Sequence, residues 1–120
     1  MAGHLQFATD MGVDLDDASA IGRLYETLLT NWKDAPRDTR TDPNVLINAL
    51  GTAFGEHLVR RSPMRWVVAS DPYGTELAVH DPTTDLLVYP ANAIAKRWTS
   101  EEAGDFIVVM SDDIARRADG

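Results

Sequence analysis

The sequence predicts an α+β domain in which helices pack on one face of a small three-stranded antiparallel meander, in the order α-α-β-β-β-α-α. Two observations lead to this prediction. Apolar residues recur with the period of a helix before residue 62 and after residue 90. Between these stretches the pattern changes to the alternation of strands, and two Asp-Pro turns separate three runs rich in Val, Leu and aromatic residues. Connections this short join antiparallel neighbours, so the three runs form one sheet.

The two predicted helices before the sheet have clear start and stop signals. The first begins near Asp14, because aspartate is favoured at helix N-caps, and it ends at Pro36. The second begins at Asp42 and Pro43, since a proline at the first helical position loses no hydrogen bond. It ends at Ser62, just before the next proline.

Two glycines, Gly51 and Gly55, lie on or near the buried side of the second helix. Each costs about 1 kcal/mol of helix propensity relative to alanine, so the close approach of another backbone is the reason we expect for them. The glycines do not form a phosphate loop, because the stretch lies inside a helix and lacks the Gly-Lys-Ser/Thr ending.

The three strands are separated by two turns of the same kind. In Asp71-Pro72 and Asp81-Pro82, the aspartate can bond the backbone ahead and the proline presets the turn angle. Pro90 closes the third strand. The predicted strands cover residues 65–70, 76–80 and 85–89.

Two further helices are predicted after the sheet. A short one covers residues 91–98. The last one starts at Thr99, because Thr99 and Glu102 have the spacing of a capping box. The chain of 120 residues has the length of one domain, which we expect over residues 14–118 after a loose arm at residues 1–13.

The composition of the chain argues against several kinds of partner and binding site. The net charge of -8 is spread along the chain and repels phosphates, so we expect no nucleic-acid partner. The absence of cysteine excludes disulfides and thiolate metal sites and fits a reducing compartment. No secretory signal pattern and no membrane-spanning apolar run of about 20 residues is present. Arginine outnumbers lysine nine to two, as in GC-rich bacterial genomes. We therefore expect a bacterial cytoplasmic protein without a membrane partner.

One short segment combines cations with a large aromatic residue. In Lys96-Arg97-Trp98, the arginine is suited to hold an anionic ligand or a partner strand, and the tryptophan offers a flat contact surface. The alternative is that Trp98 is buried against the sheet while Arg97 pairs with a carboxylate of the chain itself. Tyr73, at the tip of a turn, is a further candidate contact residue.

The histidines are the candidates for metal binding or acid–base chemistry. His80 ends the second strand close to several carboxylates, and such a group can hold a metal or transfer protons. The spacing matches no ligand signature, so we predict neither a metal site nor a cofactor. His57 lies on the second helix and needs a partner from elsewhere in the fold. The carboxylates near the hairpin ends are Asp71, Glu76, Asp81 and Asp85.

The order of several weak motifs resembles a family of small bacterial domains of unknown function. The resemblance covers about Asp42 to Glu102. It implies a common fold around the glycine-containing helix and the hairpins, and it transfers no catalytic residue. The motifs are Ala49-Leu50-Gly51, Phe54-Gly55-Glu56, Trp66, Asp71 with Tyr73-Gly74, and Tyr89-Pro90 running to Lys96-Arg97-Trp98.

Three functions follow from these observations. We favour a non-catalytic binding or protein-interaction module with a protein partner or a second copy, because no catalytic group is assembled and a small sheet has open edges. One alternative is a small hydrolase or metal-dependent enzyme that uses His80 or His57 with the hairpin carboxylates. Another is an acidic antagonist of the immunity or antitoxin kind, which the net charge would steer to a basic target.

Overall fold

A computed structural model of the chain describes residues 12–72 and 74–119. Within these ranges the fold is α+β and the element order is the predicted one. Most of the predicted arm lies outside the described residues. None of the described helices has the length and apolar character needed to cross a membrane. The elements are α2 (Ala18–Asp34), the short 3-10 helix η1 (Arg37–Thr39), α3 (Pro43–Arg61), β1 (Arg65–Asp71), β2 (Gly74–Asp81), β3 (Leu86–Val88), α4 (Pro90–Thr99) and α5 (Asp105–Asp119).

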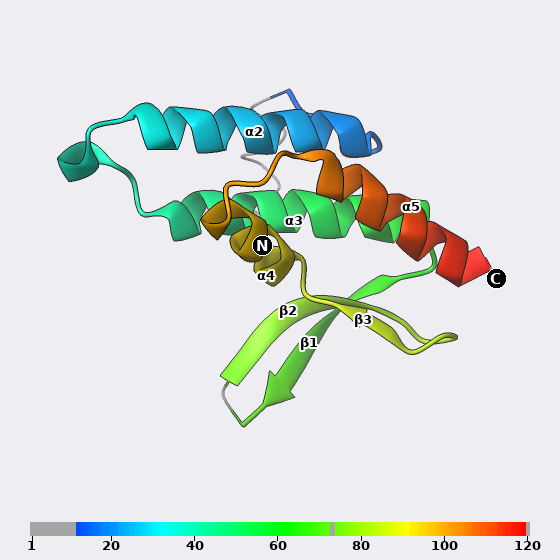
Figure 1. Cartoon of the computed structure of the whole chain (residues 1–120). Coiled ribbons are helices and arrows are strands. Elements are labelled where there is room, and N and C mark those ends of the chain that lie inside the picture. Colours follow the sequence, from blue (N-terminus) through cyan, green and yellow to red (C-terminus); the bar gives the residue numbers. More distant parts are fainter. Residues whose placement is uncertain (1–11, 73, 120) are drawn as a thin grey trace.

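The sheet is an antiparallel meander with the strand order β1-β2-β3. β1 pairs with β2 along its whole length, whereas β3 pairs only with residues 79–81 of β2. Figure 1 shows the helices gathered together and the β1–β2 hairpin extending away from them. The helices therefore cover the sheet only where the hairpin begins, at the end that carries Trp66 and Val79.

The predicted third strand is too long at both ends. Asp85 has a φ of 61°, a left-handed conformation that is incompatible with a strand. Tyr89 is already the N-cap of α4, with Pro90 at the first helical position. The strand is thus reduced to three residues. Because α4 follows directly, residues 74–78 of β2 have no neighbour on that side.

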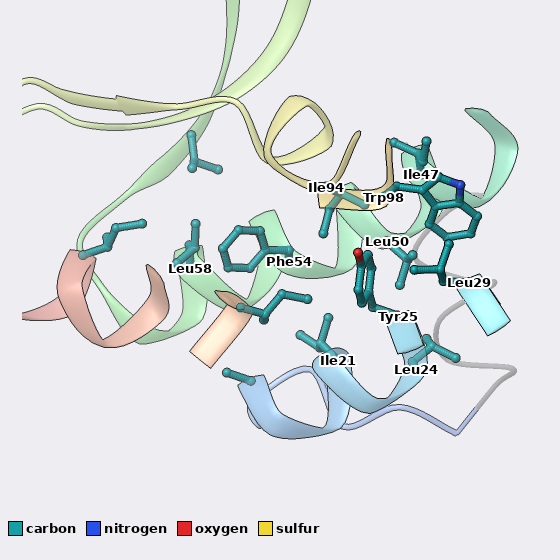
Figure 2. Close-up of a cluster of buried hydrophobic side chains, with 14 of the residues drawn as sticks. Ile21, Leu24, Tyr25, Leu29, Ile47, Leu50, Phe54, Leu58, Ile94 and Trp98 are labelled. Carbon is teal, nitrogen blue, oxygen red and sulfur yellow. The ribbon is translucent and has the colours of Figure 1, made fainter. Parts of the chain in front are cut away.

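The core lies among α2, α3, α4 and α5 and includes the end of the sheet nearest to them. Figure 2 shows Tyr25, Phe54 and Ile94, from α2, α3 and α4, pointing into one cluster. The Tyr25 hydroxyl donates to the carbonyl oxygen of Glu102 at 2.9 Å. Burial, reinforced by the nearby carboxylates of Glu102 and Glu26, raises the pKa of Tyr25 to about 12, so the phenol keeps the proton that it donates.

Aspartate side chains bond the backbone where α2 and α3 begin, but α2 begins later than predicted. Asp14, Asp17 and Asp42 each accept a hydrogen bond from the backbone amide two residues later. The predicted start at Asp42 is confirmed. The predicted start at Asp14 is wrong, because that residue organises a separate turn and Asp17 is the N-cap of α2.

The predicted capping box at Thr99 is also wrong. Thr99 is the last residue of α4, and its hydroxyl donates to the carbonyl oxygen of Ala95. The chain is then held against α2, since the Gly104 amide donates to Glu26 at 2.6 Å. A Cβ on Gly22 would lie 2.8 Å from the carbonyl oxygen of Gly104, so two backbones meet here without side chains between them. α5 begins only after this contact.

Candidate functional site

The sheet has two open edges within the described part of the chain. β1 is an edge strand over its whole length. β2 is open over residues 74–78, because β3 pairs only with the residues that follow. The backbone N–H and C=O groups on such edges are free to pair with a strand of another chain.

A groove of about 300 Å³ borders the open part of β2. One wall is this strand, and the other is formed by the middle of α3 and the start of α4. The groove is suited to an extended segment, because backbone edges and apolar side chains lie beside each other. Its lining includes Gly51, Thr75, Glu76, Leu77, Pro90 and Ala91.

The two glycines of α3 allow neighbouring groups to approach the helix closely. A Cβ on Gly51 would lie 2.6 Å from the Cα of Ala91, so the predicted backbone contact is confirmed at this position. At Gly55 the expectation of a backbone is wrong, since the neighbour is the indole ring of Trp66. The indole N–H donates to the Oε1 atom of Glu56 at 3.1 Å, which fixes the ring between α3 and β1.

Exposed apolar side chains are concentrated on the sheet. Of the five large ones in the described residues, three belong to strands. Val68 on β1 is 65% exposed and Leu77 on β2 is 41% exposed, and these two residues are direct cross-strand partners. Leu87 on β3 is also 41% exposed and pairs with His80, so it lies on the opposite face of the sheet. Val68 and Leu77 therefore form an exposed apolar pair on one face of the hairpin.

His57 needed a partner from elsewhere in the fold, and the structure provides two. It is only 2% exposed, and its Nδ1 atom lies 2.9 Å from the carbonyl oxygen of Leu15. Since a carbonyl only accepts, Nδ1 carries the hydrogen and Nε2 accepts from the Ser111 hydroxyl, at 2.7 Å. Arg61 donates to Ser111 Oγ at 2.8 Å and to Asp112 at 2.6 Å. The network joins the segment before α2 to α3 and α5.

A histidine bonded to a serine has the composition of an activated nucleophile, but its placement does not suit that role. Ser111 is fully buried and does not line the polar cleft of about 490 Å³ next to His57. In that cleft Arg60 is paired with Asp16 and Glu56, so its charge is already compensated. The Ser111–His57 pair therefore serves as a buried connection between elements.

His80 lies near the end of β2, just before the turn that leads to β3. His80 Nε2 is 2.8 Å from the Oδ1 atom of Asp85, whose side chain is in solvent. Among the described residues, no group of three His, Asp or Glu side chains is placed to share a metal ion. In the same turn, buried Asp81 accepts a hydrogen bond from the backbone N–H of Thr83 at 2.9 Å.

The pKa of Asp81 predicts a pH dependence of stability. The Thr83 N–H bond lowers this pKa below the ordinary value, because it stabilises the charged form. The contribution to stability is therefore complete above the pKa of the unfolded state and is lost as the pH falls through the lowered pKa of the folded state. Asp81→Asn is expected to remove this part of the acid destabilisation, measured by urea unfolding at a series of pH values. An unchanged acid dependence would contradict the assignment to Asp81.

The remaining candidate residues do not gather at one place. Trp98 is 5% exposed and makes edge-to-face contact with Tyr25 at a centroid distance of 6.1 Å. Arg97 pairs with Glu102 at 3.7 Å, a carboxylate of the chain itself. Lys96 is exposed near the end of α4, whereas His80 lies near the end of β2 in the sheet. Tyr73 lies outside the described residues.

No curated protein and no solved structure matches this chain. One family model matches residues 26–109, and its description is a domain of unknown function, DUF3806. The match extends the predicted resemblance in both directions, into α2 and α5. Because it takes in well over half of the 120 residues, the chain belongs to the DUF3806 family of domains of unknown function.

Proposed function

We propose that this chain is a non-catalytic protein-interaction module that binds an extended segment of a partner protein along the open side of β2. The observation that carries the proposal is the groove beside residues 74–78, where an unpaired strand edge and the exposed side chain of Leu77 lie together. Addition of a strand to a sheet edge is a common mode of peptide recognition, in which the backbone supplies affinity and alternate side chains supply specificity.

The position of β3 defines how such a segment would lie. β3 occupies the place beside residues 79–81 of β2, and a bound segment would occupy the same place beside residues 74–78. Its alternate side chains would point toward the groove, where Leu77 and Gly51 provide an apolar lining. On the other sheet face they would meet Glu76, which favours a basic residue. The segment expected is therefore one that alternates apolar with basic or polar residues.

The open stretch of β2 is short, so the interaction is expected to be transient. Five strand residues extend over about 17 Å, which limits the area that one segment can bury. The net charge of -8 favours association with basic partners and increases their rate of encounter. An acidic antagonist of a basic protein is a special case of this proposal and rests on the net charge alone.

A displayed library of seven-residue peptides with alternating apolar positions tests the proposal. Selection on the purified chain is expected to enrich peptides with basic or polar residues between the apolar ones. Leu77→Asp is expected to weaken their binding at least tenfold, as measured by fluorescence anisotropy, because it places a charge in the groove. The loss of tenfold in affinity corresponds to about 1.4 kcal/mol.

Leu87→Asp is the matched control for this experiment. Leu87 has the same exposed fraction as Leu77, 41%, but lies on the opposite face of the sheet. Its substitution is expected to leave peptide binding within about twofold of the unmodified chain. Equal losses in the two variants, or no enrichment of any peptide, would show that the groove is not the binding site.

A further inference from the structure

The outer edge of β1 is a second surface, and it is separate from the groove beside β2. We infer that two copies of the chain pair through this edge, with β1 against β1 in antiparallel orientation about a two-fold axis. The two meanders would then form one continuous six-stranded sheet. This inference does not rest on the proposed peptide site, because that site uses the other side of the hairpin.

The edge of β1 lacks the features that normally prevent strand pairing. Proteins protect exposed edges with charged residues, prolines, bulges or a covering element. Residues 66–70 of β1 are uncharged, contain no proline and pair one-to-one with β2 without a bulge. Within the described residues, β1 pairs with no strand other than β2. Such an edge is expected to be occupied by another strand.

β1 is also complementary to itself. When the two-fold axis passes beside Val68, that residue faces its own copy, and Arg65 of each chain stands opposite Asp71 of the other. The register thus places residue types of opposite charge at both ends of the new ladder, with no charged residue type between them. A shift of the register by one or two residues would separate both pairs. This complementarity is the reason to expect a second copy as the partner, ahead of an unrelated strand.

The apolar surface supports the same arrangement. Val68 is the most exposed of the large apolar residues described, at 65%, and it stands beside Leu77 on one sheet face. In the dimer, Val68 of both copies would be neighbours at the centre of the sheet. Together with Leu77 of both copies they would form one apolar stripe across the interface, so the most exposed apolar side chain of the monomer would gain a partner.

Sedimentation equilibrium on the full chain tests this inference. At about 100 μM the unmodified chain is expected to have twice the chain mass of 13.2 kDa. Val68→Lys is expected to weaken association at least tenfold, because it places two like charges opposite each other. Val109→Lys is the matched control, since this valine on α5 is 63% exposed and lies outside the sheet. It is expected to leave the dimer unchanged.

A charge exchange tests the register itself. Arg65→Asp is expected to weaken the dimer several-fold, and the double variant Arg65→Asp with Asp71→Arg is expected to restore it, because each pair is then reversed. Circular dichroism would establish that each variant is folded. A monomeric unmodified chain, equal effects of the two valine substitutions, or no recovery in the double variant would overturn the inference. If the chain is monomeric while Leu77→Asp still abolishes peptide binding, the proposed function stands and the dimer alone is excluded.

Discussion

Gly51→Ala is expected to lower the free energy of unfolding by about 2 kcal/mol, although alanine normally stabilises a helix. The new Cβ would lie 2.6 Å from the Cα and 2.8 Å from the backbone N of Ala91. Carbon atoms prefer a separation of about 3.5 to 4.0 Å, so α3 and α4 must move apart. The gain of about 1 kcal/mol in helix propensity does not offset the cost of overpacking, which is about 3 kcal/mol where backbone has to shift.

A second substitution in the neighbouring residue tests whether backbone or side-chain atoms oppose the added Cβ. Adding Ala91→Gly to Gly51→Ala removes only the Ala91 Cβ, so stability is not expected to return. At Gly55 the obstacle is the Trp66 ring, and Gly55→Ala is expected to cost much less when Trp66→Leu is also present. Both pairs form double-mutant cycles measured by urea unfolding. Full recovery with Ala91→Gly would show that the contact at Gly51 is not made by backbone.

Local signals explain which parts of the fold are predictable. Asp42 and Pro43 lie next to each other and act within a single turn, so the start of α3 follows from the sequence. Thr99 and Glu102 show an equally local signal, yet no helix starts there. The contact between Gly22 and Gly104 joins residues that are far apart in the chain, and it determines where α5 begins. A helix start that depends on such a contact is not encoded in its own few residues.

In the candidate site, too, features set by adjacent residues were predictable and features set by distant contacts were not. The hairpin was predictable from its Asp-Pro turns, but the open side of β2 arises because Tyr89 and Pro90 turn the chain into α4, so that β3 ends at Val88. The partner of His57 is Ser111, which lies 54 residues away in the sequence and has no motif of its own. The burial of Trp98 depends on Tyr25 and Trp32, whose rings meet it from α2. Helical spacing alone does not distinguish this arrangement from an exposed one.

His57→Ala is expected to lower the free energy of unfolding by about 4 kcal/mol, the largest effect we expect for a single side chain. The substitution leaves a cavity, and it leaves the Leu15 carbonyl oxygen without its donor and the Ser111 O–H without its acceptor. A buried polar group without a partner costs about 1 to 3 kcal/mol, and the loss of a large buried side chain adds to this. Urea unfolding followed by circular dichroism measures the change.

His80→Ala is the matched control, because the His80 side chain bonds the exposed carboxylate of Asp85. Its cost is expected to stay below about 1 kcal/mol, as for other surface pairs. Ser111→Ala separates the hydrogen bond from the cavity, since it removes the hydroxyl with little change in volume, and its expected cost is about 1 to 2 kcal/mol. If His57→Ala costs no more than His80→Ala, the buried network does not stabilise the fold.

The position of the His57 network also predicts which backbone amides lose their protection from hydrogen exchange in His57→Ala. His57 joins the segment before α2 to α5, and neither element contributes to the sheet. Hydrogen exchange in His57→Ala is therefore expected to accelerate first at the amides of α5, while those of the β1–β2 ladder keep their protection until global unfolding. The hairpin should then still bind its partners in a partly loosened molecule. Simultaneous loss of protection in α5 and the hairpin would mean that the two regions open as one unit, and that His57 supports the interaction surface as well as the helices.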